Sequence, residues 1–130
     1  MLHQSLTHQI IACYYRVYNT LGYGFLEKVY ENAMILEFKG SGLRCDQQMP
    51  IEVLYTGQVV GSYFSDIIVE NVVILELKAA KELSEEHEAQ LINYLKATRF
   101  EVGVLLNFGK TSEFKRKVFS NQNKSFPTKK

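Results

Sequence analysis

The sequence predicts one α/β domain, an α+β arrangement in which helices flank a mixed sheet, with the element order α-α-β-β-β-α-β. Changes of pattern along the chain indicate this fold class. Apolar residues in the first 40 positions recur at helical spacing, whereas residues 49–79 form apolar runs typical of strands. A helical stretch and a further apolar run follow in residues 84–107. With 130 residues, 46% hydrophobic and 22% charged, the composition suits a single globular domain.

Two helices are expected at the start of the chain. Residues 3–20 repeat apolar side chains at helical spacing, and Gly22 and Gly24 then favour a turn. A second helix is expected over residues 25–39, ended by Gly40-Ser41-Gly42. The predicted core-facing stripe of the first helix is Leu6, Ile10, Cys13, Tyr14 and Val17, and that of the second is Leu26, Val29, Tyr30, Ala33 and Leu36.

Three strands are expected next, over residues 49–55, 58–69 and 72–79. Thr56-Gly57 and Glu70-Asn71 form the turns between them. Because these connections are short, the strands are expected to pair antiparallel as a meander.

A third helix and a fourth strand complete the predicted core. Ser84 is a plausible N-cap for a helix that ends near Thr98, with acidic residues in its first turn. The strand over residues 101–107 follows this helical crossover and can therefore pair parallel within the sheet. Residues 113–119 alternate loosely, which fits either an edge strand or a helical turn.

We expect one domain over residues 1–120 and a basic, disordered tail over residues 121–130. Residues 110–130 hold seven of the fifteen Lys and Arg and a single acid, Glu113, so this end is basic although the net charge of the chain is +1. Such a distribution is compatible with contact to a phosphate backbone. A solvated terminus that aids solubility is the alternative.

Location and redox state are also indicated. No apolar run approaches 18 residues and no signal-peptide pattern is visible, so we expect a cytoplasmic protein without membrane contact. Cys13 and Cys45 are too few for a disulfide framework or a zinc site, and we expect reduced packing residues.

Charged residues within the third strand are the main functional signal. Glu76 and Lys78 lie two positions apart and therefore project from the same face of an apolar strand, and Asp66 precedes Glu76 by ten positions. Buried charges are costly unless they are paired, hydrogen-bonded or bound to a metal. An exposed ion pair of little energetic value is one interpretation. A metal-dependent site is the other.

Phosphodiester hydrolysis would use these residue types. The reaction needs a hard divalent cation, and Mg²⁺ or Mn²⁺ prefers carboxylate oxygens such as those of Asp66 and Glu76. A nearby cation such as Lys78 could orient the attacking water or stabilise developing negative charge.

Several motifs together resemble a known group of proteins. Asp66 with Glu76-Leu77-Lys78 resembles the catalytic signature of the PD-(D/E)XK nuclease superfamily, and residues 24–30, GFLEKVY, match the motif of its GxxExxY protein family. Gln90 and Tyr94 resemble the Q-x-x-x-Y motif of RecB-like nucleases, and residues 102–109 resemble the last core strand of the family. The resemblance covers residues 8–119.

The resemblance implies a restriction-endonuclease-like core, a four-stranded mixed sheet flanked by helices, in a Mg²⁺- or Mn²⁺-dependent nuclease that acts on nucleic acid, with DNA the expected substrate. Asp66 and Glu76 would be metal ligands, the Leu77 carbonyl could add another, and Glu27 would reach the metal directly or through water. Lys78 would contact the nucleophilic water. Gln90 and Tyr94 would position the lysine, the phosphate or the strand.

The sequence departs from the family pattern at three places. Ser65 precedes Asp66 where the superfamily name has proline, Tyr23 replaces the proline of a Gly-Pro-Gly turn, and Tyr18 stands where a histidine is common. These changes leave the acidic core intact.

Alternatives remain open for individual residues and for the whole chain. Glu27 could be a solvated helix residue, Gln90 and Tyr94 could be packing residues, and Glu31 is expected to be solvated, as are Glu70 and Glu88. The chain could be a non-catalytic nuclease-fold module that binds nucleic acid or a protein partner. A homodimer or a subunit of a larger assembly is a further interpretation.

Overall fold

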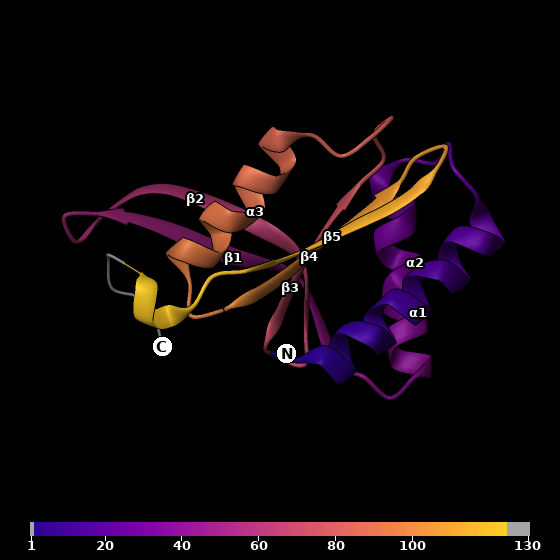
Figure 1. The fold of residues 1–130 in the computed structure, drawn as a ribbon, viewed down its shortest axis with the longest axis horizontal. Helices are drawn as coiled ribbons and strands as arrows, with labels where there is room; N and C mark the ends of the chain where they lie inside the picture. Colours follow the sequence, from indigo (N-terminus) through magenta and orange to yellow (C-terminus); the bar gives the residue numbers. More distant parts are fainter. Residues whose placement is uncertain (1, 125–130) are drawn as a thin grey trace.

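The computed structural model describes residues 2–124 and contains a five-stranded mixed sheet with helices on both faces (Figure 1). The strands lie in the order β1-β2-β3-β4-β5. The helices and strands are α1 (Gln4–Leu21), α2 (Glu27–Gly40), β1 (Cys45–Tyr55), β2 (Gln58–Val69), β3 (Val73–Lys78), α3 (Glu85–Ala97), β4 (Val102–Phe108) and β5 (Ser112–Val118). The predicted fold class and element order are confirmed, with β5 added.

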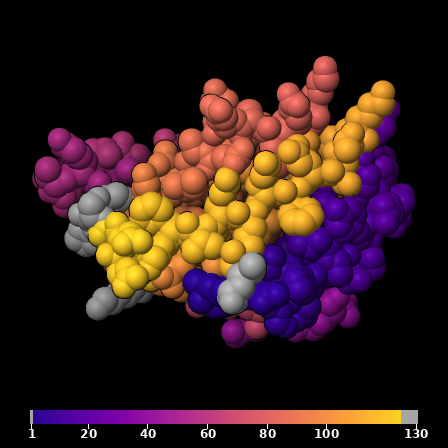
Figure 2. Space-filling model, in the orientation of Figure 1, coloured from indigo at the N-terminus to yellow at the C-terminus, as the bar shows by residue number. Residues whose placement is uncertain are grey.

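The topology agrees with the predicted meander and crossover. β1, β2 and β3 pair antiparallel through short turns, and β4 pairs parallel with β3 after the crossover through α3. The predicted count of four strands is wrong, because Ser112–Val118 pairs antiparallel with β4 along its whole length. This strand closes one edge of the sheet and runs between α3 and α1 on the face that Figure 2 shows.

Two apolar layers hold the helices against the sheet. α1 and α2 pack on one face over side chains such as Ile67, Leu75 and Val104, while α3 packs on the other face over Ile68 and Ile74. Alternate residues of β2, β3 and β4 therefore point to opposite layers, as expected for strands buried on both faces. The predicted stripe of α1 is confirmed at Ile10, Cys13, Tyr14 and Val17.

The predicted stripe of α2 is largely wrong. Leu26 and Leu36 are 81% and 72% exposed, and Val29 is also exposed. The buried face consists of Tyr30, Glu31, Met34, Ile35 and Phe38. The helix begins only at Glu27, and Tyr30 stacks on Phe108 with ring centroids 4.2 Å apart, which rotates the contact face away from Leu26 and Val29.

The structure describes the start of the predicted tail, residues 121–124. Asn121–Asn123 form a turn of 3-10 helix, and Lys124 Nζ donates hydrogen bonds to the carbonyls of Thr98 at 2.7 Å and Phe100 at 2.8 Å. These carbonyls follow the end of α3, where backbone acceptors lack helical partners. The rest of the predicted tail, residues 125–130, lies outside the described residues.

Residues 2–124 contain no helix that is both long and apolar enough to cross a membrane. Cys13 and Cys45 are both free thiols, as expected from the sequence, and Cys13 is buried in the layer under α1.

A buried polar cluster fixes the loop that follows β3. The side chain of Asn107 is fully buried, accepts a hydrogen bond from the Ala80 N–H at 3.0 Å and donates one to the Ala80 carbonyl at 2.9 Å. Tyr14 Oη donates to the Asn107 carbonyl and accepts from the Glu113 N–H at 3.0 Å. Buried polar groups that are fully paired in this way define one backbone arrangement.

Gly109 is predicted to be required for this arrangement. A Cβ at Gly109 would lie 2.2 Å from the Ala80 carbonyl oxygen, so Gly109→Ala must displace backbone and should lower the free energy of unfolding by about 1–3 kcal/mol. Urea unfolding measures the change. Gly40→Ala is the matched control because nothing lies within 4 Å of the added Cβ. Equal stability of the two variants would contradict the proposed close approach.

Candidate metal centre

Asp66 and Glu76 lie where β2 and β3 separate. The ladder between these strands contains only three pairs and ends at Ile67 opposite Leu75, so Asp66 and Glu76 occupy the next position. There the backbone bonds are replaced by carboxylates: the Asp66 N–H donates to Glu76 Oε2 at 2.9 Å, and the Leu77 N–H donates to Asp66 Oδ2 at 2.8 Å. The two acids thus hold the strands apart and occupy the gap between them.

Burial makes this pair of acids electrostatically unfavourable when both are ionised. Glu76 is only 4% exposed, and loss of hydration together with the nearby Asp66 charge raises its pKa from 4.5 to about 8. Burial also raises the pKa of Asp66, although the Leu77 N–H opposes this effect. The positive charge of Lys78 acts against both increases. Among the described residues, Lys78 therefore offsets only part of the cost of ionising the two carboxylates.

Lys78, Gln90 and Tyr94 meet on the α3 side of the sheet. Lys78 Nζ lies 3.4 Å from Gln90 Oε1, and this contact joins the lysine to α3. Tyr94 is buried, its ring centroid lies 5.6 Å from that of Tyr63, and burial and then the Glu76 charge raise its pKa to about 12. Tyr94 therefore packs in the layer and also borders the acidic pair.

Glu27 lies near the acidic pair but does not contact it. It is the first residue of α2 and is exposed, and its charge contributes to the raised pKa of Asp66. The structure thus places Glu27 at the rim of the site.

Glu31 is a site residue that the sequence analysis missed. It was expected to be solvated, yet it is 4% exposed and accepts hydrogen bonds from Gln47 at 2.7 Å and Gln48 at 3.1 Å, besides pairing with Lys28. Its charge raises the pKa of both Asp66 and Glu76. The signal that could have identified it is its spacing: Glu31 follows Glu27 by one helical turn and therefore lies on the same face.

The strand opposite Asp66 is also distorted. The register of β1 and β2 omits a pair between Gln47 and Met49, where Gln48 has a φ of 55° and would otherwise face Asp66. A positive φ is uncommon for a residue other than glycine. This distortion turns the Gln48 amide toward Glu31, so α2 and β1 meet beside the carboxylates.

Residues 4–118 match the family model of the PD-(D/E)XK nuclease superfamily. The chain belongs to this superfamily. Among solved structures, the crystal structure of SSO0001 is similar, with 17% sequence identity and a TM-score of 0.57 over 72% of this chain and 50% of that one. This chain thus matches half the length of SSO0001, and at that identity the similarity shows the fold alone. No curated protein sequence matches the chain.

Nucleases of the PD-(D/E)XK superfamily typically use divalent metal ions, and the residues present here fit such an ion. Each carboxylate has one oxygen bonded to a backbone N–H, which leaves a second oxygen as a ligand. The Leu77 N–H points toward β2, and its carbonyl is expected on the same side. Among the described residues, no three His, Cys, Asp or Glu side chains converge on one point, so water and substrate would complete the coordination, as is usual for Mg²⁺.

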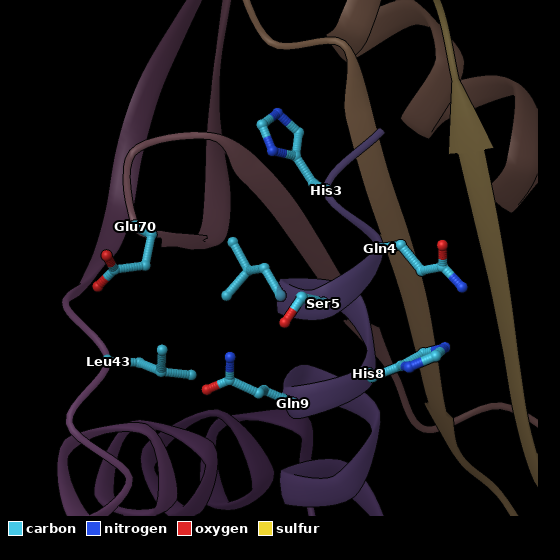
Figure 3. Close-up of a pocket in the computed structure, with 8 residues that line it drawn as sticks. His3, Gln4, Ser5, His8, Gln9, Leu43 and Glu70 are labelled. Atoms are coloured by element: carbon cyan, nitrogen blue, oxygen red, sulfur yellow. The ribbon is translucent and has the colours of Figure 1, made fainter. Parts of the chain in front are cut away.

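A separate cavity of about 900 Å³ contains none of the predicted site residues (Figure 3). It lies beside the start of α1 and is bounded by Leu43 and by Glu70 of the β2–β3 turn. His3 and His8 lie on different sides of it and do not point toward one another. This cavity is therefore separate from the candidate site at Asp66 and Glu76.

Glu76→Gln should stabilise the protein when divalent cations are absent. Between pH 4.5 and about 8 the folded protein retains a proton on Glu76 that the unfolded chain has released, so stability falls as pH rises through this range. The side-chain amide in Glu76→Gln does not ionise, so this variant avoids the loss of stability, which is of the order of a few kcal/mol near pH 8. Thermal unfolding in EDTA across this pH range measures the effect. The exposed control Glu82→Gln should reproduce the wild-type profile, and a wild-type-like profile for Glu76→Gln would refute the assigned burial cost.

Proposed function

We propose that this protein is a divalent-metal-dependent nuclease that hydrolyses phosphodiester bonds in nucleic acid, with DNA as the expected substrate and Mg²⁺ or Mn²⁺ as the expected ion. One observation supports this proposal above all: the buried carboxylate of Glu76 and the half-buried carboxylate of Asp66 lie side by side between two strands, and Lys78 faces the same layer. Membership in a nuclease superfamily adds the reaction class.

Each residue of the candidate site would have a separate role in phosphodiester hydrolysis. A cation bound between Asp66 and Glu76 would polarise the scissile phosphate and lower the pKa of an attacking water. Asp66 and Glu76 would fix the cation, because the backbone N–H groups that they accept from hold each carboxylate in place. Lys78 would orient the attacking water and stabilise the negative charge that develops on the phosphate.

Gln90 would keep the ammonium of Lys78 in position. The 3.4 Å contact between Gln90 Oε1 and Lys78 Nζ reaches from α3 to the end of β3, so the lysine is directed by a helix rather than by a mobile loop. Tyr94 lies one turn further along α3 and closes the layer beside Glu76. Glu27 at the rim would reach the cation through water.

We place the chain in the GxxExxY family within the superfamily, and the motif has a structural explanation here. The Tyr30 hydroxyl donates to the Gly22 carbonyl at 2.6 Å and accepts from the Phe25 N–H at 3.1 Å. The motif tyrosine thus holds the glycine turn, and this turn sets where Glu27 begins α2.

A non-catalytic nuclease-fold module that binds nucleic acid or a protein partner is the alternative. It is favoured by the backbone hydrogen bonds that each carboxylate accepts, since these give Asp66 and Glu76 a structural role even without a cation. Cation binding and cleavage separate the two functions.

Cation binding is expected to depend on both carboxylates. Calorimetric titration with Mn²⁺ should show a site in the wild type that Asp66→Asn weakens by about 10-fold or more, because one charged oxygen ligand is lost. The exposed Asp46→Asn is the matched control and should bind as the wild type does. If Asp66→Asn and Asp46→Asn bind Mn²⁺ equally, the metal site is elsewhere.

Cleavage is expected to depend on Glu76 and Lys78. With single- and double-stranded DNA and Mg²⁺ or Mn²⁺, Glu76→Ala and Lys78→Ala should each reduce the cleavage rate by about 100-fold or more, since each removes stabilisation of the transition state. Lys39→Ala, at the exposed end of α2, controls for the loss of a lysine. Absence of cleavage by the wild type, or equal rates for all three variants, would remove the enzymatic proposal and leave the binding module.

A further inference from the structure

A cavity of about 690 Å³ opens directly beside the candidate metal centre. It is lined by the loop after β3, the β4–β5 turn and the segment that joins α1 and α2. The β4–β5 turn and the segment between α1 and α2 lie at the upper right of Figure 1. The cavity lining is formed by Tyr23, Gly24, Phe25, Leu26, Glu27, Ala79, Ala80, Lys81, Gly109 and Lys110. Glu27 lies at the rim of the candidate metal centre and also lines this cavity, and Ala79 of the lining directly follows Lys78. The cavity therefore adjoins the candidate metal centre.

One wall of the cavity is an exposed apolar surface that we call the aromatic lip, formed by Tyr23, Phe25 and Leu26. Their side chains are 58%, 48% and 81% exposed. Contiguous exposed apolar surface of this kind often marks a binding site.

The lip is held in place rather than loosely attached. Gly22 and Gly24 have φ values of 68° and 111°, conformations that glycine adopts at little cost, and the Tyr30 hydroxyl bonds to Gly22 and Phe25 on either side of the turn. The Phe25 ring also meets the Tyr30 ring edge to face, with centroids 6.1 Å apart. The turn is thus ordered before any ligand binds, which reduces the entropy lost on binding.

The opposite wall carries two lysines, and hydrogen bonds hold its backbone in place. Ala80 is held on both backbone groups by the buried Asn107 side chain, and Tyr18 Oη donates to the carbonyls of Gly109 at 2.8 Å and Lys110 at 2.9 Å. Lys81 and Lys110 extend from these segments, are exposed, and form no ion pair with any residue in the described part of the chain. The cavity therefore combines a rigid apolar wall with two unpaired cations.

We propose that this cavity binds an unpaired nucleotide of a single-stranded nucleic acid, with the base against the aromatic lip and the adjoining phosphates near Lys81 and Lys110. The proposal rests on the proposed nuclease function and adds the form of the substrate. Bases stack on aromatic side chains without regard to sequence, and lysines contact phosphates, so the two walls match the two halves of a nucleotide.

An unpaired base fits this site better than a base within a duplex. Bases of a duplex are stacked on both sides and reach a protein cavity only after they are flipped out, at a cost of a few kcal/mol. A base that is already free does not have this cost. We therefore expect the cavity to prefer single strands, because the lip provides aromatic rings for a free base and the two lysines provide positive charge for its phosphates.

Fluorescence anisotropy with a labelled oligothymidylate tests the site, with EDTA present so that metal-dependent cleavage does not occur. Tyr23→Ala and Leu26→Ala should each weaken binding by about 5-fold or more, because the first removes an aromatic ring for stacking and the second removes apolar contact area beside it. Leu36→Ala and Tyr55→Ala are matched controls, because these side chains are 72% and 70% exposed on α2 and at the end of β1, away from the cavity. The controls should bind as the wild type does.

The lysines provide a second measurement. Lys81→Ala and Lys110→Ala should each reduce the slope of log affinity against log salt concentration by about 0.7, the value for one phosphate contact on a single strand. Lys39→Ala should leave the slope unchanged. A hairpin duplex of the same length should bind the wild-type protein at least about 10-fold more weakly than the oligothymidylate.

The outcomes separate this inference from the proposed function. Weakened binding in the lip variants supports the nucleotide site even if the wild type does not cleave DNA, a result that would refute only the nuclease activity. Equal binding by Tyr23→Ala, Leu26→Ala and the controls, or a duplex that binds as tightly as the single strand, overturns the nucleotide site while leaving cleavage at Asp66 and Glu76 untouched.

Discussion

The structure depends on two carboxylates that take the place of backbone hydrogen bonds between β2 and β3. Once the ladder ends at Ile67 and Leu75, the amides of Asp66 and Leu77 need acceptors, and the side chains of Glu76 and Asp66 provide them. The same bonds place the buried Glu76 beside the half-buried Asp66, where the two negative charges repel each other. A pair of this kind satisfies the backbone and leaves negative charge that a bound cation would neutralise.

The surrounding polar contacts keep this gap in one geometry. Asn107 fixes the loop after Lys78 through both backbone groups of Ala80, and the Tyr14 hydroxyl joins β4 to β5 from the opposite layer. On the far side of Asp66, Glu31 joins α2 to the distorted part of β1 through Gln48. Helices on both faces of the sheet therefore contribute to the position of the acids.

The sequence predicted those features of the site that follow from the side-chain periodicity of a single strand. The two-residue repeat of a strand placed Glu76 and Lys78 on one face. A role for Gln90 came only from the resemblance to a nuclease motif, and its 3.4 Å contact with Lys78 depends on how α3 packs on the sheet. The sequence did not predict Glu31, because its burial depends on Gln47 and Gln48, which come from another element. The fifth strand was ambiguous for a similar reason: Ser112–Val118 becomes a strand through its partner β4, and its own alternation is weak.

The wrong prediction of the buried face of α2 and the exposure of the aromatic lip have the same cause. Periodicity favoured a buried stripe through Leu26 and Val29, but the Tyr30 hydroxyl is bonded to the glycine turn and its ring is stacked on Phe108. Once Tyr30 is placed in this way, the helix must turn its Met34 and Phe38 face to the sheet, and Leu26 and Phe25 are left in solvent beside the acids. The apolar periodicity of α2 predicts that Leu26 is buried, but the structure leaves it exposed beside a charged site. Such a departure from the local pattern is typical of positions that serve binding rather than packing, and it supports the assignment of the lip to a ligand.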